Sequence, residues 1–125
     1  MEIILTHKES EEFFHNALCN GLNYIQDYGL ELDYKKAEYH SAKLKLENPC
    51  YEDVLMQILK DGNKLTLTDI ECDGEYTRSI TLDDVHSRVQ KTPIRFLMDM
   101  VNENDDAETG DVIIQSVFFE DIIFG

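Results

Sequence analysis

The sequence predicts an α+β fold in a single domain that covers residues 1–125. Two observations predict it: apolar residues recur at helical spacing between Phe14 and Tyr28, and two alternating segments flank Asp73-Gly74. A chain of 125 residues, 42% of them hydrophobic, is long enough for one domain with a buried core. We therefore expect a long N-terminal helix, a β-hairpin near residues 64–81 in a small antiparallel sheet, and short C-terminal helices.

The long N-terminal helix is the element with the clearest signals. Thr6 with Glu9, or Ser10 ahead of two further acids, gives an N-cap with negative charge in the first turn, which the helix dipole favours. Gly29 supplies the left-handed position that commonly ends a helix. Residues 2–6 are short and β-branched, which predicts either an edge strand or an N-terminal arm. The apolar stripe of this helix contains Phe14, Ala17, Leu18, Gly21, Leu22, Ile25 and Tyr28.

The segment at residues 30–47 allows two interpretations. Its apolar residues alternate in two runs, which favours two strands, but Lys35–Glu38 suits a helix equally well. We favour the strands. Asn48-Pro49 then predicts the N-cap and the first position of a helix that ends near Asp61. The two alternating runs are Leu30, Leu32 and Tyr34, followed by Ala42, Leu44 and Leu46.

A hairpin and two short helices are expected after Gly62. Asp73-Gly74 is a strong turn signal between the alternating runs of the hairpin. Thr81 with Asp84 predicts the start of one short helix, and Thr92-Pro93 predicts the start of another. The residues expected to face inward from this last helix are Ile94, Leu97, Met98 and Val101.

The C-terminal segment is unusually apolar. Residues 112–124 hold nine aliphatic or aromatic side chains, which would form a large exposed apolar patch if nothing covered them. Either the chain's own domain or a second copy must therefore shelter this segment. Because symmetric dimers are the commonest closed assemblies, we expect a homodimer with this segment at its interface. The predicted interface residues are Val117, Phe118, Phe119, Ile122, Ile123 and Phe124.

The net charge of −15 excludes several partners and suggests one alternative function. Proteins that bind nucleic acid or anionic membranes need clustered Lys and Arg, so neither is an expected direct partner. The alternative is an acidic mimic of nucleic acid, which would inhibit or sequester a basic nucleic-acid-binding protein. Its candidate surface consists of Asp99, Glu103, Asp105, Asp106, Glu108 and Asp111.

The cysteines and the termini favour a cytoplasmic protein. Cys19, Cys50 and Cys72 are odd in number and lack the Cys-x-x-Cys spacing of many redox and metal motifs. The N-terminus lacks the basic start and the long apolar run of a signal peptide. No apolar run reaches the length of a membrane span.

The sequence offers no complete metal site. Asp69, Glu71 and Asp73 resemble the start of a calcium loop, but the twelfth position is Ile80, where a bidentate carboxylate is required. His15 and Cys19 are four residues apart and share one helix face, which makes half a transition-metal site and the only weak candidates. We therefore expect no metal and no cofactor.

The sequence also lacks a recognisable catalytic constellation. We find no nucleophile elbow, no phosphate-binding loop and no dinucleotide fingerprint. A catalytic interpretation would need one of His15, His40 or His86 to share a pocket with Cys50 or a buried carboxylate. The basic cluster at residues 78–95 resembles a helix-turn-helix surface, but the second helix is too apolar to read base edges. The sequence thus favours a non-catalytic acidic protein-interaction module.

Overall fold

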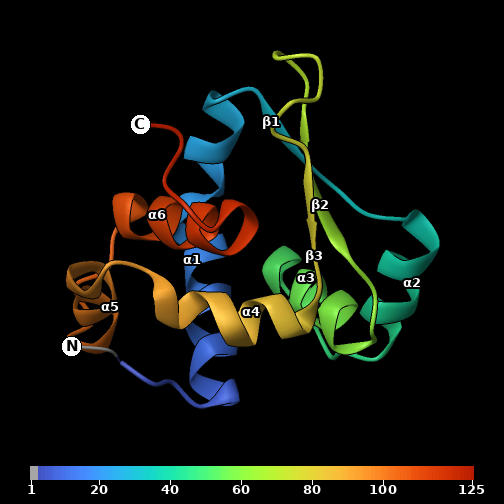
Figure 1. Cartoon of the computed structure of the whole chain (residues 1–125). Coiled ribbons are helices and arrows are strands. Elements are labelled where there is room, and N and C mark those ends of the chain that lie inside the picture. The colour runs from blue at the N-terminus through green and yellow to red at the C-terminus, as the bar shows by residue number, and fades with distance from the viewer. Residues whose placement is uncertain (1–2) are drawn as a thin grey trace.

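The computed structural model describes residues 3–125, which form six α-helices, one short 3-10 helix and a three-stranded antiparallel sheet (Figure 1). Within the segment for which an edge strand or an arm was expected, residues 3–6 have no regular secondary structure, and residue 2 lies outside the described residues. The predicted α+β class is confirmed, as are the long first helix and the short C-terminal helices.

Helix α1 spans His7–Asp27, as its terminal signals predict. Thr6 is the N-cap, and the predicted capping box forms. The Glu9 amide donates to Thr6 Oγ1 at 3.1 Å, and the Thr6 amide donates to Glu9 Oε1 at 2.9 Å. Gly29 follows the helix with φ +79°, a value that glycine adopts without strain. The helix buries Phe14, Ala17, Leu18, Gly21 and Ile25.

The sheet has the strand order β1-β2-β3, and every pair is antiparallel. Strand β1 spans Leu30–Asp33, β2 spans Leu65–Asp69 and β3 spans Arg78–Ile80. Strands β2 and β3 form the predicted hairpin, but residues 70–77 connect them through a longer loop instead of a two-residue turn. Asp73 and Gly74 both adopt positive φ in this loop.

Residues 36–44 correct the strands expected in the 30–47 segment. Only β1 forms there, and helix α2 spans Lys36–Leu44. The helix places Ala42 in the core and leaves Leu44 87% exposed, so the alternation of these two residues does not mark a strand face. Helix α3 spans Tyr51–Lys60 with Cys50 as its N-cap, two residues later than the predicted cap at Asn48.

The second half of the chain forms helix α4, Leu82–Arg88, the 3-10 turn η1, Val89–Lys91, helix α5, Ile94–Val101, and helix α6, Ala107–Phe119. The capping box predicted between Thr81 and Asp84 starts α4. Asp106 is the N-cap of α6, and its side chain accepts a hydrogen bond from the Thr109 amide at 3.0 Å.

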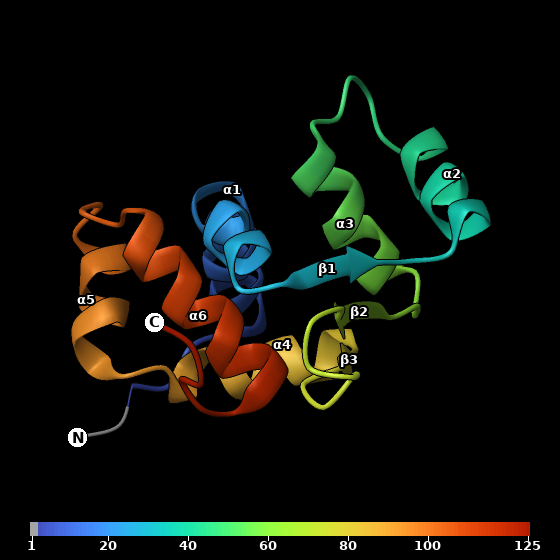
Figure 2. The ribbon, with the colours of Figure 1, turned by 90° about the horizontal axis from the view of Figure 1, so that it is seen from above.

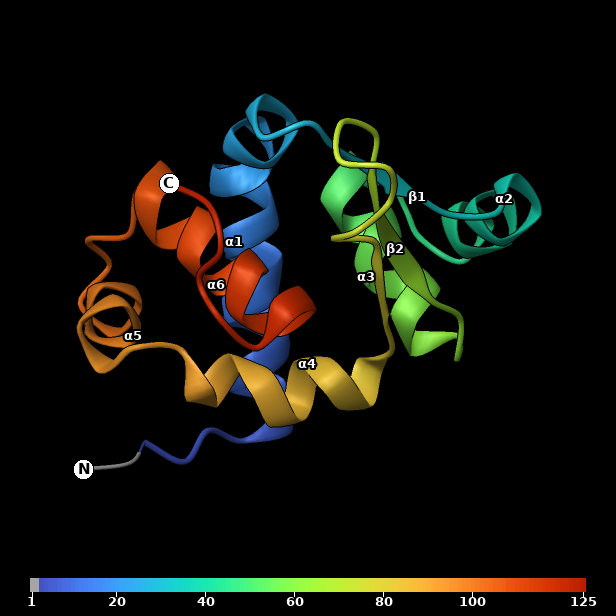
Figure 3. The ribbon, with the colours of Figure 1, turned by 45° about the horizontal axis from the view of Figure 1, so that its top comes forward.

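Helix α1 is the central element of the fold. Figure 2 shows α1 between the helices α5 and α6 on one side and the sheet with α3 on the other. Helix α6 packs across α1 and is buried from Thr109 to Phe118, so its polar residues Asp111 and Gln115 are covered together with its apolar ones. After α6, the chain turns back along this helix to the C-terminus (Figure 3).

Candidate functional site

The C-terminal segment is covered by its own domain. Val117 is fully buried, and Phe118 is 2% exposed and packs near Phe14, with 6.4 Å between the ring centroids. The expectation that these two residues face a partner is therefore wrong, because the core that α6 completes already shelters them. Phe119 and Phe124 are half-buried, whereas Ile122 and Ile123 remain 41% and 39% exposed.

Gln115 fixes the last residues against α6. Its side-chain oxygen accepts hydrogen bonds from the amides of Ile123 and Phe124, both at 2.8 Å. Its side-chain nitrogen donates to the Phe124 carbonyl and to Asp111 Oδ1. Tyr28 donates a hydrogen bond to the other oxygen of Asp111, and burial, together with this bond, raises the pKa of Tyr28.

Most acids of the predicted mimic surface have structural roles. Asp111 is buried beneath the C-terminal residues. Asp106 caps α6, Asp105 accepts a hydrogen bond from the Asn20 side chain, and Glu108 lies 3.7 Å from Arg95. Among the described residues, only two of the six acids have no side-chain hydrogen bond or ion pair, and these are Asp99 and Glu103.

Helix α5 exposes an apolar face that the sequence assigned to the core. Its buried residues are Phe96, Leu97 and Met100, so the inward prediction is right for Leu97 and wrong for Ile94, Met98 and Val101. Because the sequence of α5 is almost entirely apolar, apolar side chains lie on every side of the helix. The spacing of apolar residues alone therefore does not identify the face that is buried. We use the name α5 surface for the exposed side chains of Ile4, Ile94, Met98 and Val101, which are 85%, 42%, 42% and 54% exposed.

The two ends of the α5 surface carry opposite charges. Lys91 and Arg95 lie near the start of the helix, while Asp99 and Glu103 lie toward and beyond its end. Arg95 also stacks over the Phe96 ring at 4.4 Å from its centroid. The N-terminal arm borders the same region, because Ile3 and Ile4 line a cavity with Lys91 and Ile94.

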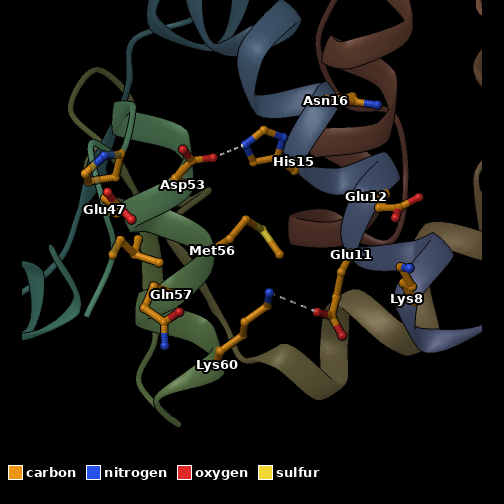
Figure 4. Close-up of a pocket in the computed structure, with 12 residues that line it drawn as sticks. Lys8, Glu11, Glu12, His15, Asn16, Glu47, Asp53, Met56, Gln57 and Lys60 are labelled. Carbon is orange, nitrogen blue, oxygen red and sulfur yellow. Dashed lines mark hydrogen bonds and ion pairs between the residues drawn. The ribbon is translucent and has the colours of Figure 1, made fainter. Parts of the chain in front are cut away.

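A groove of about 560 Å³ separates α1 from α3 on the opposite side of α1 from α5 (Figures 2 and 4). Met56 lies in this groove between two groups of hydrogen-bonded or ion-paired side chains. At one end, Glu11 pairs with Lys60 at 3.6 Å and with His86 Nε2 at 2.8 Å. His7 stacks on His86 with 3.9 Å between the ring centroids.

The other end of the groove holds a cluster of potential metal ligands. His15 Nε2 lies 2.8 Å from Asp53 Oδ1, as Figure 4 shows. One donor atom from each of His15, Cys50 and Asp53 lies within 4.8 Å of the other two. Asp53 also closes the α3 cap, because its Oδ2 accepts the Cys50 amide at 3.1 Å. This bond is the main reason why the pKa of Asp53 is lowered.

Cys19 lies beside this cluster on the next turn of α1. Burial, followed by the negative charges of Glu52 and Cys50, raises the pKa of the Cys19 thiol to about 11. The face of α1 that carries His15 and Cys19 therefore lies opposite the N-terminus of α3. That helix end supplies Cys50 and Asp53 from more than thirty residues away in sequence. The sequence predicted only the α1 half of this cluster, because nothing in the local sequence predicts which helix end lies opposite.

The loop with calcium-like spacing has no free carboxylate at its first position. Asp69 is 5% exposed, and its oxygens accept hydrogen bonds from the amides of Glu71, Cys72 and Tyr76 at 2.8–3.2 Å. These bonds lower the pKa of Asp69. The carboxylate organises the hairpin loop, which agrees with the interpretation of this acidic run as a turn.

The proximity of His15 to Cys50 bears on catalysis as well as on metal binding. A cysteine nucleophile needs a base to take its proton and a third group to orient that base. Here Asp53 is shared between His15 and the cap of α3, and Cys50 is itself the cap residue. The three donor atoms lie within 4.8 Å of one another, a spacing from which a single cation can contact all three.

Comparison of the chain with protein-family models, with curated proteins and with solved structures finds no match. Within residues 3–125, no helix combines the length and the apolar character required to cross a membrane. The functional inference therefore depends on the geometry of the α5 surface and of the α1–α3 groove.

Proposed function

We propose that this protein is a non-catalytic interaction module that self-associates as a symmetric homodimer through the α5 surface. The observation that carries the proposal is the exposed row Ile94, Met98 and Val101 on one face of α5, which contrasts with the buried apolar residues of α6. These positions have the i, i+4, i+7 spacing of helices that pack against a partner. A second copy would remove this row from water.

Charge complementarity favours a second copy as the partner. A two-fold axis near Met98 pairs two α5 helices in antiparallel orientation, so Ile94 of one copy meets Val101 of the other. The same operation sets the basic end of one copy, with Lys91, opposite the acidic end of the other, with Glu103. Local attraction at both ends then offsets the long-range repulsion between two chains of charge −15.

One further feature of the chain supports this assignment. Ile122 is exposed and shares a cavity with Lys91 and Pro93, so part of the C-terminal segment can extend the same interface. We also propose a cytoplasmic location, because Cys19, Cys50 and Cys72 are all free thiols, which a reducing compartment preserves.

Light scattering coupled to size-exclusion chromatography tests the proposal. We expect a dimer that dissociates on dilution across the range from about 1 to 100 μM, since the apolar row is small for an obligate interface. Met98→Asp should shift the protein to monomer at every concentration. Leu44→Asp is the matched control, because Leu44 is 87% exposed on α2, away from the α5 surface.

A wild-type monomer throughout this range would contradict the proposal. So would a dimer that survives Met98→Asp and is lost with Leu44→Asp. Salt-sensitive capture of a basic nucleic-acid-binding protein by the monomer would instead favour the acidic-mimic alternative. Circular dichroism of each variant separates a loss of assembly from a loss of folding.

A further inference from the structure

We infer that the facing ends of α1 and α3 form a binding site for a zinc-class divalent metal ion, with His15, Cys50 and Asp53 as ligands and Cys19 as the fourth. The site lies on the α3 side of α1, away from the α5 surface, so it does not depend on the proposed dimer (Figure 2). It would add a metal link between two helices that already meet through the His15–Asp53 and Glu11–Lys60 contacts beside the groove.

The chemistry of the four donors suits a borderline-soft cation. Zinc in proteins is bound by imidazole nitrogen, thiolate sulfur and carboxylate oxygen, and structural sites usually have four such ligands. The cluster itself supplies one imidazole, one thiol and one carboxylate, and Cys19 adds a second thiol from the next turn of α1, close enough to feel the charges of Cys50 and Asp53. Harder ions such as calcium and magnesium prefer oxygen donors alone, so the thiols argue against them.

The spacing within each helix points the donors to one place. His15 and Cys19 are one turn apart on α1 and therefore lie on the same face. Cys50 and Asp53 are the N-cap and third residues of α3, which the capping box brings together at the helix end. Two ligands from each of two helices is a common way to build a site that needs the folded chain.

The observed distances are near those of a coordination shell. Two ligands of a tetrahedral zinc ion, with bonds of about 2.0–2.3 Å, lie roughly 3.3–3.8 Å apart. The His15–Asp53 pair is closer than this at 2.8 Å, while the three donors of the cluster all fall within 4.8 Å. Side-chain movements of about an ångström would therefore centre an ion among His15, Cys50 and Asp53, and Cys19 is the nearest further soft donor on α1 for the fourth position.

The local charge also favours a cation. Glu52 and Asp53 lie at the site, and Glu47 lines the same groove. The N-terminus of α3 opposes them with a partial positive charge of about half an elementary charge. Two carboxylates exceed that charge, and a bound cation would balance the remainder.

Cobalt substitution in the reduced, metal-free protein tests the inference. Addition of Co²⁺ should produce the thiolate-to-cobalt charge-transfer band and the intense visible bands of a tetrahedral site. Zn²⁺ should then abolish these bands at one equivalent. Competition with a chromophoric chelator gives the zinc affinity, and the melting temperature should rise with zinc because the ion binds the folded state.

The variants distinguish a loss of folding from a loss of metal binding. Cys50→Ser keeps a good N-cap while removing a soft ligand, so the helix should persist and the affinity should fall by at least about 100-fold. His15→Gln and Cys19→Ser should each weaken binding. Cys72→Ser and His40→Gln are the matched controls, since both residues are exposed and lie outside the cluster.

Three results would overturn the inference. The first is the absence of the charge-transfer band when Co²⁺ is added to the fully reduced protein. The second is a band that survives Cys50→Ser and disappears with Cys72→Ser. The third is an unchanged zinc affinity in His15→Gln. In that case the His15–Asp53 contact would be only a structural hydrogen bond between α1 and α3.

Discussion

Gly21 on α1 and Gly110 on α6 lie against each other where these two helices cross. A Cβ atom on Gly21 would lie 2.5 Å from the Asp111 amide nitrogen and 2.5 Å from the Gly110 carbonyl carbon. A Cβ on Gly110 would lie 2.8 Å from the Ala17 carbonyl oxygen. Backbone atoms thus set the closest approach at the centre of the fold, and no side chain can move aside to make room.

Gly21→Ala should therefore destabilise the protein. Replacing glycine by alanine inside a helix ordinarily stabilises it by about 0.5–1 kcal/mol. Here the added methyl group must push α6 away from α1, and overpacking of this kind costs about 1–3 kcal/mol. Urea unfolding measures the difference, with Asn23→Ala on the exposed face of α1 as the control. A Gly21→Ala protein as stable as the wild type would show that the helices can separate without cost.

Replacement of Gln115 should release the C-terminal residues. Gln115 is fully buried and makes four hydrogen bonds, three of them to the backbone of Ile123 and Phe124. Gln115→Ala leaves these backbone groups and Asp111 Oδ1 without this partner, while Tyr28 still bonds Asp111 Oδ2, and the loss should cost at least about 2 kcal/mol. Hydrogen exchange should show faster exchange of the Ile123 and Phe124 amides. The exposed Gln26→Ala is the control, and equal protection in both variants would contradict the proposed role.

The features that sequence predicted well are those determined locally. The Thr6–Glu9 capping box depends on residues three apart, and it forms as expected. The local pattern does not decide the secondary structure of residues 36–44, because the Lys and Glu residues suit a helix whereas the alternation of apolar residues suits a strand. Packing of Ala42 against the core and of Tyr39 on Tyr34, with 5.1 Å between their ring centroids, accompanies the helix. Tertiary contacts thus override a weak pattern.

The sequence predicted only part of each of the two candidate sites, for a related reason. The helical spacing of His15 and Cys19 predicts a shared face, but the approach of α3 follows from the whole fold. In α5, apolar side chains surround the helix, so hydrophobic spacing alone does not distinguish the buried Leu97 from the exposed Met98. Both sites depend on which surfaces the remaining elements leave uncovered.

Asp69 should make stability depend on pH in the acid range. Its carboxylate accepts three backbone amides, which lowers its pKa in the folded state. The unfolded chain has the ordinary aspartate pKa of about 3.9, so the folded state holds the proton less tightly. The stabilisation is fully present above the unfolded pKa and is lost as pH falls through the lowered folded value.

Urea midpoints of wild type and Asp69→Asn across this range test the linkage. The amide keeps one acceptor oxygen but carries no charge, so the variant should be less stable than the wild type near neutral pH. The difference should shrink as the pH falls below about 4. Asp73→Asn in the same loop is the control, because Asp73 is exposed and already has the positive φ that asparagine tolerates. A difference between wild type and Asp69→Asn that does not change with pH would contradict the ionic role.

Charge reversal at the ends of α5 gives the sharpest test of the dimer geometry. Lys91 and Glu103 have no side-chain hydrogen bond or ion pair among the described residues, so their replacement should leave the monomer intact. In the antiparallel arrangement each lies opposite the other in the partner copy. Lys91→Glu and Glu103→Lys should each weaken dimerisation by about 2- to 30-fold, because each change removes two symmetric ion pairs worth about 0.2–1 kcal/mol apiece.

The double variant should regain the wild-type dissociation constant, because both ends again meet opposite charges across the interface. Sedimentation equilibrium at low and high salt measures each constant, and the differences between variants should shrink at high salt as screening increases. A parallel arrangement, or a partner at another surface, predicts effects that simply add in the double variant. Restoration therefore requires that these two residues meet across a two-fold axis.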